Sequence, residues 1–184
     1  MWDSTFKVIR DYYHLRGLKT RLWVRAQYFF RLLYPSRTRT ENSRSHFCVY
    51  FLPYNPETKK VFLVLHKKAG IWLFPGGHMD KGETPTQTLK REVWEELGLI
   101  LENWRNFLPF FLSITKIPKR LNTKCRKHFD IWYRIPTDGK NFNVDMNEFL
   151  KVGWFSIAEA REIATDSEIL AGLDKMQEFF EKVS

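Results

Sequence analysis

Three glutamates near the middle of the chain have the spacing that places them on one face of a helix. Glu92 and Glu96 are one turn apart, and Glu95 lies three residues from Glu92. Carboxylates this close repel one another unless water, basic side chains or a divalent cation compensates their charge. Mg²⁺ prefers oxygen ligands and keeps several waters, which leaves room for phosphate groups. The alternative is a solvated acidic helix face that Lys90 and Arg91 neutralise.

The residues around these glutamates predict the helix that positions them. Thr-Pro-Thr-Gln at residues 84–87 is typical of a helix start, with threonine as the N-cap and glutamine completing a capping box. The helix is expected to run to Leu97, and Gly98 is expected to end it. Leu89 and Val93 form a neighbouring apolar stripe that can pack on a sheet, which leaves the carboxylates on the outward face.

A longer pattern surrounds the glutamates over residues 77–99, which read GHMDKGETPTQTLKREVWEELGL. It is G-x5-E-x7-R-E-U-x-E-E-x-G-U, where U is aliphatic, and every fixed position is filled. The segment therefore resembles the signature of the Nudix hydrolases, and the expected strands extend the resemblance over residues 45–184. The matching residues are Gly77, Glu83, Arg91, Glu92, Val93, Glu95, Glu96, Gly98 and Leu99.

The resemblance implies a divalent-cation site and a hydrolytic reaction. Nudix enzymes hydrolyse a diphosphate linked to another moiety, often a nucleoside, with Mg²⁺ or Mn²⁺ as the cofactor. By this likeness Glu92, Glu95 and Glu96 hold the metal, and the backbone carbonyl of Gly76 adds one more oxygen. A divalent cation lowers the charge with which a diphosphate repels a nucleophile, and it makes bound water more acidic.

Other positions of the motif are expected to support this site. Glu83 and Arg91 are expected to pair, which would fix the loop before the helix and preorganise the carboxylates. Gly77 and Gly98 are expected at backbone positions that a Cβ would obstruct.

The attacking water must lose a proton, and a carboxylate within hydrogen-bond reach can accept it. Family members differ in this general base, some using a glutamate of the motif and others a glutamate from a loop late in the chain. Here Glu148, four residues before the strand expected at 152–155, is the candidate, and Asp145 is the next one. The alternative is that Glu148 is an ordinary surface carboxylate.

Aromatic and polar residues outside the motif are candidates for substrate binding. Trp72 and Phe74 precede the Pro-Gly-Gly loop, where they could stack on a base or pack in the core. Alternation in the strand expected at 128–135 puts His128 and Asp130 on one face, which could line the cleft or simply face water.

Basic residues crowd the loop expected before this strand. They could form a lid over phosphates or a solvated charged surface, and Arg126 and Lys127 are the candidates for contact with substrate. His78 is expected to be a turn residue. The basic residues of the loop are Lys116, Lys119, Arg120, Lys124, Arg126 and Lys127.

The chain has 184 residues, of which 43% are hydrophobic and 16% aromatic, and this indicates one folded domain with a modest extension. The formal net charge is +9, and most of it falls in residues 1–44. We therefore expect a basic, aromatic, helical extension and linker at 1–44 and a Nudix hydrolase domain at 45–184. Helical spacing predicts helices from Ser4 to Arg16 and from Lys19 to Tyr34, the second stopped by Pro35.

The order of the expected elements predicts the fold class. Short runs rich in Val, Phe and Tyr indicate strands, and the first two are expected to pair. The prediction is an α/β (α+β) fold, a Nudix-type α/β/α sandwich with a mixed sheet and an N-terminal helical extension. Strands are expected at 46–54, 60–66, 71–74, 107–117, 128–135 and 152–155, and helices at 84–97, after a capping box at Ser156, and at 167–182.

The helical extension has three candidate roles. It could pack on the main domain or on a second subunit in a homodimer, touch an anionic membrane surface, or contact nucleic acid such as RNA. Its aromatic content favours packing. Cys48 and Cys125 are expected to be free thiols, the chain has no apolar run of bilayer length, and its start does not resemble a secretory signal. A cytoplasmic location is expected.

The first functional hypothesis is a Mg²⁺-dependent hydrolase that cleaves the P–O–P linkage of a nucleoside diphosphate derivative. Removal of pyrophosphate from the 5′ end of RNA is the alternative within the same chemistry, supported by the basic surface alone. A non-catalytic binding module would lose carboxylates of the motif, and this chain retains them. An isopentenyl-diphosphate-isomerase-like enzyme would use an early cysteine such as Cys48, but the intact motif argues against it.

Overall fold

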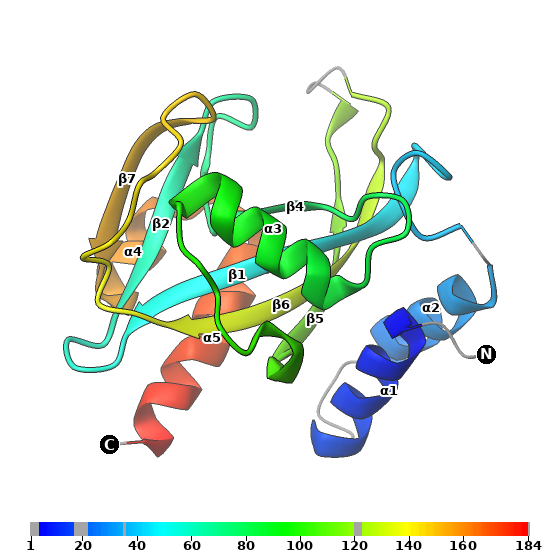
Figure 1. The fold of residues 1–184 in the computed structure, drawn as a ribbon, viewed down its shortest axis with the longest axis horizontal. Helices are drawn as coiled ribbons and strands as arrows, with labels where there is room; N and C mark the ends of the chain where they lie inside the picture. Colours follow the sequence, from blue (N-terminus) through cyan, green and yellow to red (C-terminus); the bar gives the residue numbers. More distant parts are fainter. Residues whose placement is uncertain (1–3, 17–21, 35, 120–122, 184) are drawn as a thin grey trace.

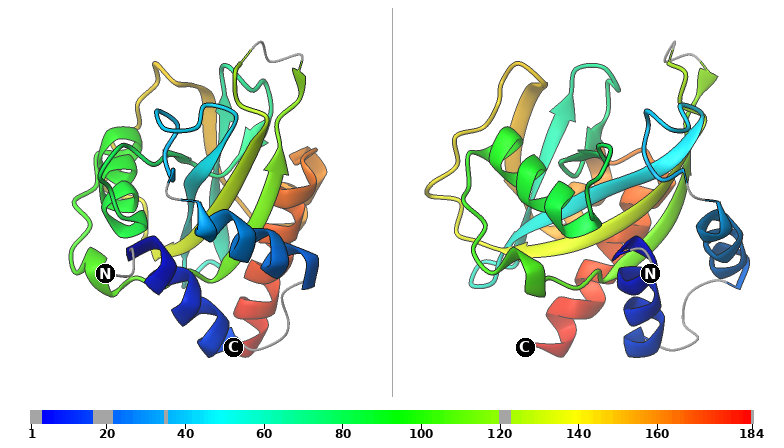
Figure 2. Two further views of the ribbon diagram at one scale, coloured as in Figure 1. Left: turned by 90° about the vertical axis from the view of Figure 1, so that its right-hand side faces the viewer. Right: turned by 45° about the vertical axis from the view of Figure 1, so that its right-hand side comes forward.

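The computed structural model describes residues 4–16, 22–34, 36–119 and 123–183. A mixed sheet is covered by helices on both faces, which confirms the expected α/β/α sandwich (Figure 1). The left view of Figure 2 separates the layers, with α3 on one side of the sheet and α4 and α5 on the other. The helices are α1 (Ser4–Arg16), α2 (Leu22–Leu33), α3 (Pro85–Leu97), α4 (Ile157–Ile163) and α5 (Ser167–Lys182), with a short 3₁₀ helix at Trp104–Asn106.

The sheet is organised around β1, which pairs in parallel with β6 and antiparallel with both β2 and β4. β5 pairs with β6 on its other side, and β2 also pairs with β3 and β7, all antiparallel. The strands are β1 (Ser45–Asn55), β2 (Lys60–His66), β3 (Trp72–Leu73), β4 (Gly76–His78), β5 (Phe111–Lys116), β6 (Lys127–Pro136) and β7 (Phe149–Phe155).

Two expectations about the strands differ from the structure. The expected strand 107–117 is reduced to β5, because Pro109 has no N–H to donate to a ladder and the chain before it forms the 3₁₀ helix. The Pro-Gly-Gly segment was expected as a loop with His78 as a turn residue, but Gly76–His78 forms β4 on β1. Pairing of the backbone decides this strand, and glycine has no side chain that could indicate it.

Alternate residues of β1 and β6 contribute to two separate hydrophobic clusters. Phe129, Ile131 and Tyr133 pack with α1, α2 and α3, whereas Leu52 and Trp132 pack with α4 and α5. Because helices cover both faces, residues 128–133 are all buried. The interpretation of this strand as one with a wet face was therefore wrong.

The N-terminal helices are part of the first cluster. Ile9 and Tyr12 of α1 and Val24 and Tyr28 of α2 are buried in it. The hydroxyl of Tyr28 donates to the carbonyl oxygens of Ser113 at 2.9 Å and Asp130 at 2.7 Å, which ties α2 to β5 and β6. Packing on the main domain is thus what these helices do in the structure, while the division at residues 44 and 45 stays a prediction.

A second surface of α2 is exposed and apolar. Phe29, Phe30 and Leu33 are each more than half exposed, as is Leu22 at the start of the helix. None of the helices within the described residues is both long and apolar enough to cross a membrane. Some expected helix boundaries and one expected loop cation lie outside the described residues, at 17–21, Pro35 and Arg120.

Replacing Tyr28 by phenylalanine tests the attachment of α2 to the sheet. We expect Tyr28→Phe to lower the free energy of unfolding by about 1–2 kcal/mol, because two buried carbonyls lose a donor without any change in packing. Urea denaturation measures the effect. Tyr34→Phe, at an exposed position, is the matched control and should leave stability unchanged; equal stability of both variants would contradict the role of the Tyr28 hydroxyl.

Candidate active site

Local sequence fixes the helix that carries the three glutamates. The Thr84 side chain accepts from the Gln87 amide, and the Gln87 side chain accepts from the Thr84 amide, so the expected capping box is confirmed. Gly98 ends α3 in the left-handed region, at φ 66°, and donates its N–H to the Trp94 carbonyl. Leu89, like the other residues of the apolar stripe, is fully buried against the sheet. The acidic face of α3 is therefore held in a defined orientation.

Arg91 connects this acidic face to the loop before the helix. Its guanidinium donates to both carboxylate oxygens of Glu83, at 2.8 and 3.0 Å, which is the pair expected from the motif. The same group donates to Glu92 at 2.8 Å and Glu95 at 2.9 Å, and to the carbonyl oxygen of His78 at 2.9 Å. One planar cation thus orients three carboxylates and one backbone segment.

Glu83 is held from a second side by groups that the motif did not indicate. The Thr88 hydroxyl donates to its carboxylate at 2.7 Å, and the Asp80 amide donates at 3.0 Å. Burial would raise the pKa of Glu83, but hydrogen bonds from Arg91, Asp80 and Thr88 outweigh it and lower that pKa below its usual value. Glu83 therefore stays charged and positions Arg91. Thr88 was missed, because a threonine inside a helix carries no signal of such a contact.

Two of the three glutamates on this face of α3 are buried. The exposed fraction is 8% for Glu92 and 4% for Glu96. Burial raises the pKa of Glu92 to about 7, against the opposing effect of Arg91. Burial, with repulsion from Glu92 next, raises the pKa of Glu96 well above its usual range.

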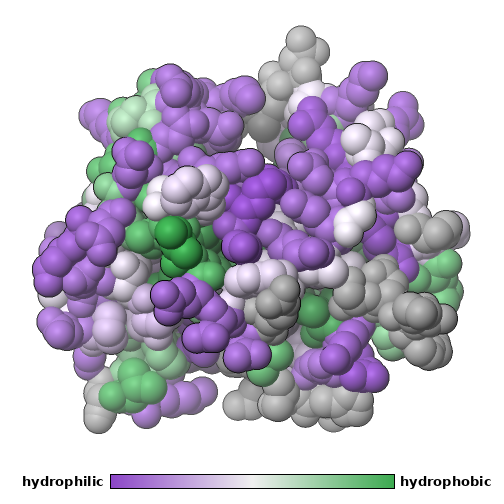
Figure 3. All heavy atoms as spheres, in the orientation of Figure 1, coloured by the Kyte–Doolittle hydropathy of each residue, from purple (hydrophilic) through white to green (hydrophobic). Residues whose placement is uncertain are grey.

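One oxygen of this pair has no protein partner. Glu96 Oε2 is buried and accepts no hydrogen bond from the part of the chain that the structure describes. An orphaned carboxylate oxygen next to two further carboxylates is a donor set that suits a hard divalent cation. The residues present therefore fit the metal that the motif implies. Hydrophilic residues gather over α3 at the centre of this face of the molecule (Figure 3).

Two glycines of β4 allow the strand to approach α3. Gly76 has φ +144°, and a Cβ there would collide with the backbone of Val49. A Cβ on Gly77 would occupy the position of the Glu92 carboxylate. The Gly76 backbone also makes a hydrogen bond to Glu96, which places this strand against the predicted metal ligands. The predicted contribution of its carbonyl oxygen stays a prediction.

The loop before β7 is fastened to the end of α3. The amides of Asn143 and Asp145 donate to the carbonyls of Leu97 and Glu96, at 2.8 and 2.9 Å. Glu148, directly before β7, is exposed, and its charge raises the pKa of both buried glutamates of α3. The structure thus brings Glu148 close to the motif carboxylates; its role as general base stays a prediction.

Several predicted substrate residues lie elsewhere. Phe74 and Asp130 are fully buried, so neither can contact a substrate, and these two interpretations were wrong. Phe74 packs in the cluster beneath α4 and α5, which was the core-packing alternative, and Asp130 accepts hydrogen bonds from Ser113 and Thr115. Trp72 is half-buried and stays a candidate for stacking. Strand alternation misplaced Asp130 because helices cover both faces of β6.

The remaining three predicted substrate residues make contacts within the protein. His128 is buried, and its Nε2 lies 3.3 Å from Nε2 of His78. Lys127 donates to Gln27 of α2 at 3.0 Å, and Arg126 donates to the Cys125 carbonyl at 2.7 Å. Of these residues, Arg126 is exposed and stays a candidate for phosphate contact.

The comparisons with known proteins agree with this geometry. Residues 43–173 match the model of the NUDIX domain. The chain belongs to the Nudix hydrolase family. An RNA pyrophosphohydrolase of Rickettsia africae is 30% identical over 146 residues, which cover 67% of this chain and 86% of that protein. One from Tolumonas auensis is 45% identical over 56 residues, which span only 29% of its length.

Solved structures of Nudix proteins share the fold. The dihydroneopterin triphosphate pyrophosphohydrolase of E. coli superposes with a TM-score of 0.61 at 16% identity, over 74% of this chain and 95% of that one. The NUDIX domain of Shewanella oneidensis NrtR, solved with ADP ribose, gives a TM-score of 0.58 at 15% identity, over 84% and 97%. At these identities the likeness establishes the architecture alone.

The pKa of Glu92 predicts how stability depends on pH in the metal-free protein. The folded chain keeps a proton on Glu92 up to about pH 7, whereas the unfolded chain releases it near 4.5, so the folded state loses stability as pH rises between these values. Glu92→Gln removes this effect. The unfolding free energy of the wild type minus that of the variant should therefore fall by at most about 3 kcal/mol between about pH 5 and about pH 8.

Urea denaturation of both proteins at the two pH values measures this difference. Glu102→Gln, at an exposed position outside the motif, is the control and should keep the pH dependence of the wild type, because Glu92 is unchanged. A wild-type-minus-variant difference that stays constant would contradict the burial of a protonated Glu92.

Proposed function

We propose that this chain is a Mg²⁺-dependent pyrophosphohydrolase that cleaves the diphosphate linkage of a nucleoside diphosphate derivative. The observation that carries the proposal is the buried pair Glu92 and Glu96, with the unpartnered oxygen of Glu96, beside Glu95 on one face of α3. Burying two carboxylates costs free energy unless a cation compensates their charge. Arg91 compensates Glu92 but does not reach Glu96 in any hydrogen bond of the described residues.

The proposed ligands are Glu92, Glu95, Glu96 and the backbone carbonyl of Gly76, with Mg²⁺ or Mn²⁺ as the ion. When bound, such an ion neutralises charge on the diphosphate and makes a nearby water more acidic. The contribution of Arg91 is to hold Glu92 and Glu95 in fixed rotamers from one side, so that their free oxygens face the substrate. This is positioning rather than contact with reacting atoms.

We assign the general base to Glu148. It lies at the end of a loop fastened to α3, and its charge acts on both buried glutamates. An exposed carboxylate next to the site can take the proton of the attacking water and release it to solvent. Asp145, whose amide is bound to the Glu96 carbonyl, is the second candidate.

The 5′-triphosphate end of RNA is the second candidate substrate. Two observations favour it: the relatives reported above bear the name RNA pyrophosphohydrolase, and the chain carries a formal net charge of +9. A basic surface attracts a polyanionic chain without regard to its sequence. The bond that breaks, P–O–P, is the same in both candidates.

A homodimer through the N-terminal helices is a further part of the proposal. The inner side of α2 is buried on the sheet, while Phe29, Phe30 and Leu33 remain exposed on the outer side. Contiguous apolar side chains on a helix surface are typical of a contact with another protein. Membrane and RNA contact at this surface are supported only by the neighbouring basic residues.

Replacing Glu96 by glutamine tests the proposed metal site. We expect Glu96→Gln to reduce Mg²⁺-dependent release of phosphorylated products by at least about a hundredfold, because a ligand oxygen is lost while the volume of the side chain is kept. The assay compares ADP-ribose, nucleotide sugars, dinucleoside polyphosphates, NADH, nucleoside triphosphates and 5′-triphosphorylated RNA, with Mg²⁺ or Mn²⁺. Glu102→Gln is the control and should keep full activity. Wild-type rates in Glu96→Gln would rule out the assigned site.

Replacing Glu148 by glutamine tests its proposed role as the general base. Glu148→Gln should lower kcat by about a hundredfold or more and remove the acidic limb of its pH profile, while Mn²⁺ binding stays close to that of the wild type. Paramagnetic relaxation of water protons measures the binding of Mn²⁺. An unchanged pH profile in this variant would move the general base to another carboxylate, with Asp145→Asn as the next variant.

A further inference from the structure

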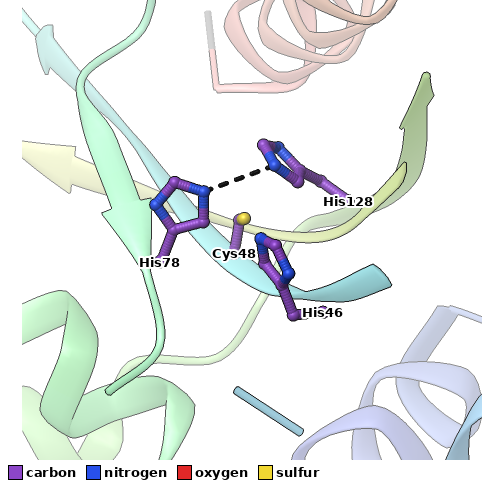
Figure 4. Close-up of side chains that lie close together, drawn as sticks. All are labelled: His46, Cys48, His78 and His128. Carbon is purple, nitrogen blue, oxygen red and sulfur yellow. Dashed lines mark hydrogen bonds between the residues drawn. The ribbon is translucent and has the colours of Figure 1, made fainter. Parts of the chain in front are cut away.

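Three histidines and one cysteine converge where β1, β4 and β6 meet, on strands rather than on α3. Suitable ligand atoms of His46, Cys48, His78 and His128 all lie within 4.8 Å of one another (Figure 4). His46, Cys48 and His128 are buried, and His78 is partly buried. The mechanism proposed above uses none of these side chains.

The register of the sheet brings these residues together. His46 lies opposite His128 in the parallel pair of β1 and β6, and Cys48 lies opposite His78 in the antiparallel pair of β1 and β4. His46 and Cys48 are two residues apart on β1, so they project from the same face. The convergence therefore follows from backbone pairing and does not depend on a flexible loop.

The distance between two of the donor atoms matches tetrahedral coordination. With metal–nitrogen bonds of about 2.0–2.1 Å, two nitrogens of a tetrahedral zinc site are about 3.3 Å apart. Nε2 of His78 and Nε2 of His128 are 3.3 Å apart. The sulfur of Cys125 lies 3.6 Å from Nε2 of His46 and 3.8 Å from Nε2 of His78, so a second thiol borders the cluster.

The orientation of His46 also indicates a ligand. Nδ1 of His46 lies 2.8 Å from the carbonyl oxygen of Asn42, so it donates its proton there and its Nε2 lone pair is available for the cluster. Histidines that bind metals are commonly oriented by such a carbonyl.

We propose that His46, Cys48, His78 and His128 form a structural zinc site, separate from the Mg²⁺ site on α3. A set of three imidazole nitrogens and one thiolate favours Zn²⁺, whereas Mg²⁺ prefers oxygen ligands. Zinc binding displaces the proton of the Cys48 thiol to solvent, and the thiolate and three neutral imidazoles then complete the coordination. Four protein ligands leave no open position, so the ion is structural.

The site would hold β4 in place next to the carboxylates. His78 presents its side chain to the cluster and its carbonyl oxygen to Arg91, at 2.9 Å. Gly77, its neighbour, lies against the Glu92 carboxylate. A zinc ion that joins β4 to β1 and β6 therefore fixes the strand on which the acidic face of α3 rests.

Metal analysis of the full chain tests this site. The protein, expressed with added zinc and dialysed against zinc-free buffer, should retain about one zinc ion per chain by plasma mass spectrometry. Cys48→Ser and His128→Gln should each lose most of that zinc, and the midpoint of thermal unfolding of the wild type should fall after chelation. His66→Gln, which alters a histidine outside the cluster, is the matched control and should retain the ion.

Two further measurements keep the outcome decisive. Co²⁺ in the zinc-depleted wild type should give the visible bands of tetrahedral cobalt and a near-ultraviolet sulfur-to-cobalt band, which decides the matter even where a variant fails to fold. Glu92→Gln should keep its zinc although it loses Mg²⁺-dependent activity, so the two sites fail separately. A wild type without zinc, an octahedral cobalt spectrum, or full zinc in both ligand variants would overturn the proposal.

Discussion

The ion pairs of Arg91 are the interaction on which the candidate site depends. Its guanidinium orients Glu83, Glu92 and Glu95 and binds the carbonyl of His78, so the loop, the strand and the helix meet at one cation. A lysine could not replace it, because a single ammonium lacks the planar fork that serves several acceptors. Without this cation Glu83, Glu92 and Glu95 would lose the donor that they share, and the acidic face of α3 would not be held in a fixed arrangement before a metal binds.

The elements that the sequence predicted well are those whose signals are local. The helix boundaries at Thr84 and Ser156 follow from capping boxes, in which donor and acceptor are three residues apart. The same holds for the Glu83–Arg91 pair, because the motif fixes both partners on one loop and one helix. The mixed sheet was predicted as a class, but the parallel pairing of β1 with β6 involves segments far apart in the chain and has no local signal.

The wrong interpretations have one physical origin: contacts between segments that are far apart in the chain. Alternation and position near the motif predict Asp130 and Phe74 as substrate residues, but neither signal can reveal the second helical layer, which α5 supplies. The cluster of His46, Cys48 and His128 was missed for the same reason: its members are neighbours only in the register of the sheet. The residue types around His78 predict a turn, but the backbone of His78 forms part of β4.

Strand β4 supplies a ligand to each of the two proposed metal sites, and the two ligands differ in their chemistry. β4 offers backbone oxygen to the hard carboxylate site at Gly76 and an imidazole to the soft site at His78, two residues further along. Carboxylates bind nearly all divalent metals, so the ion that occupies the site on α3 depends on metal availability more than on affinity. A buried site that binds zinc with three nitrogens and a sulfur would stiffen the strand that supports these carboxylates.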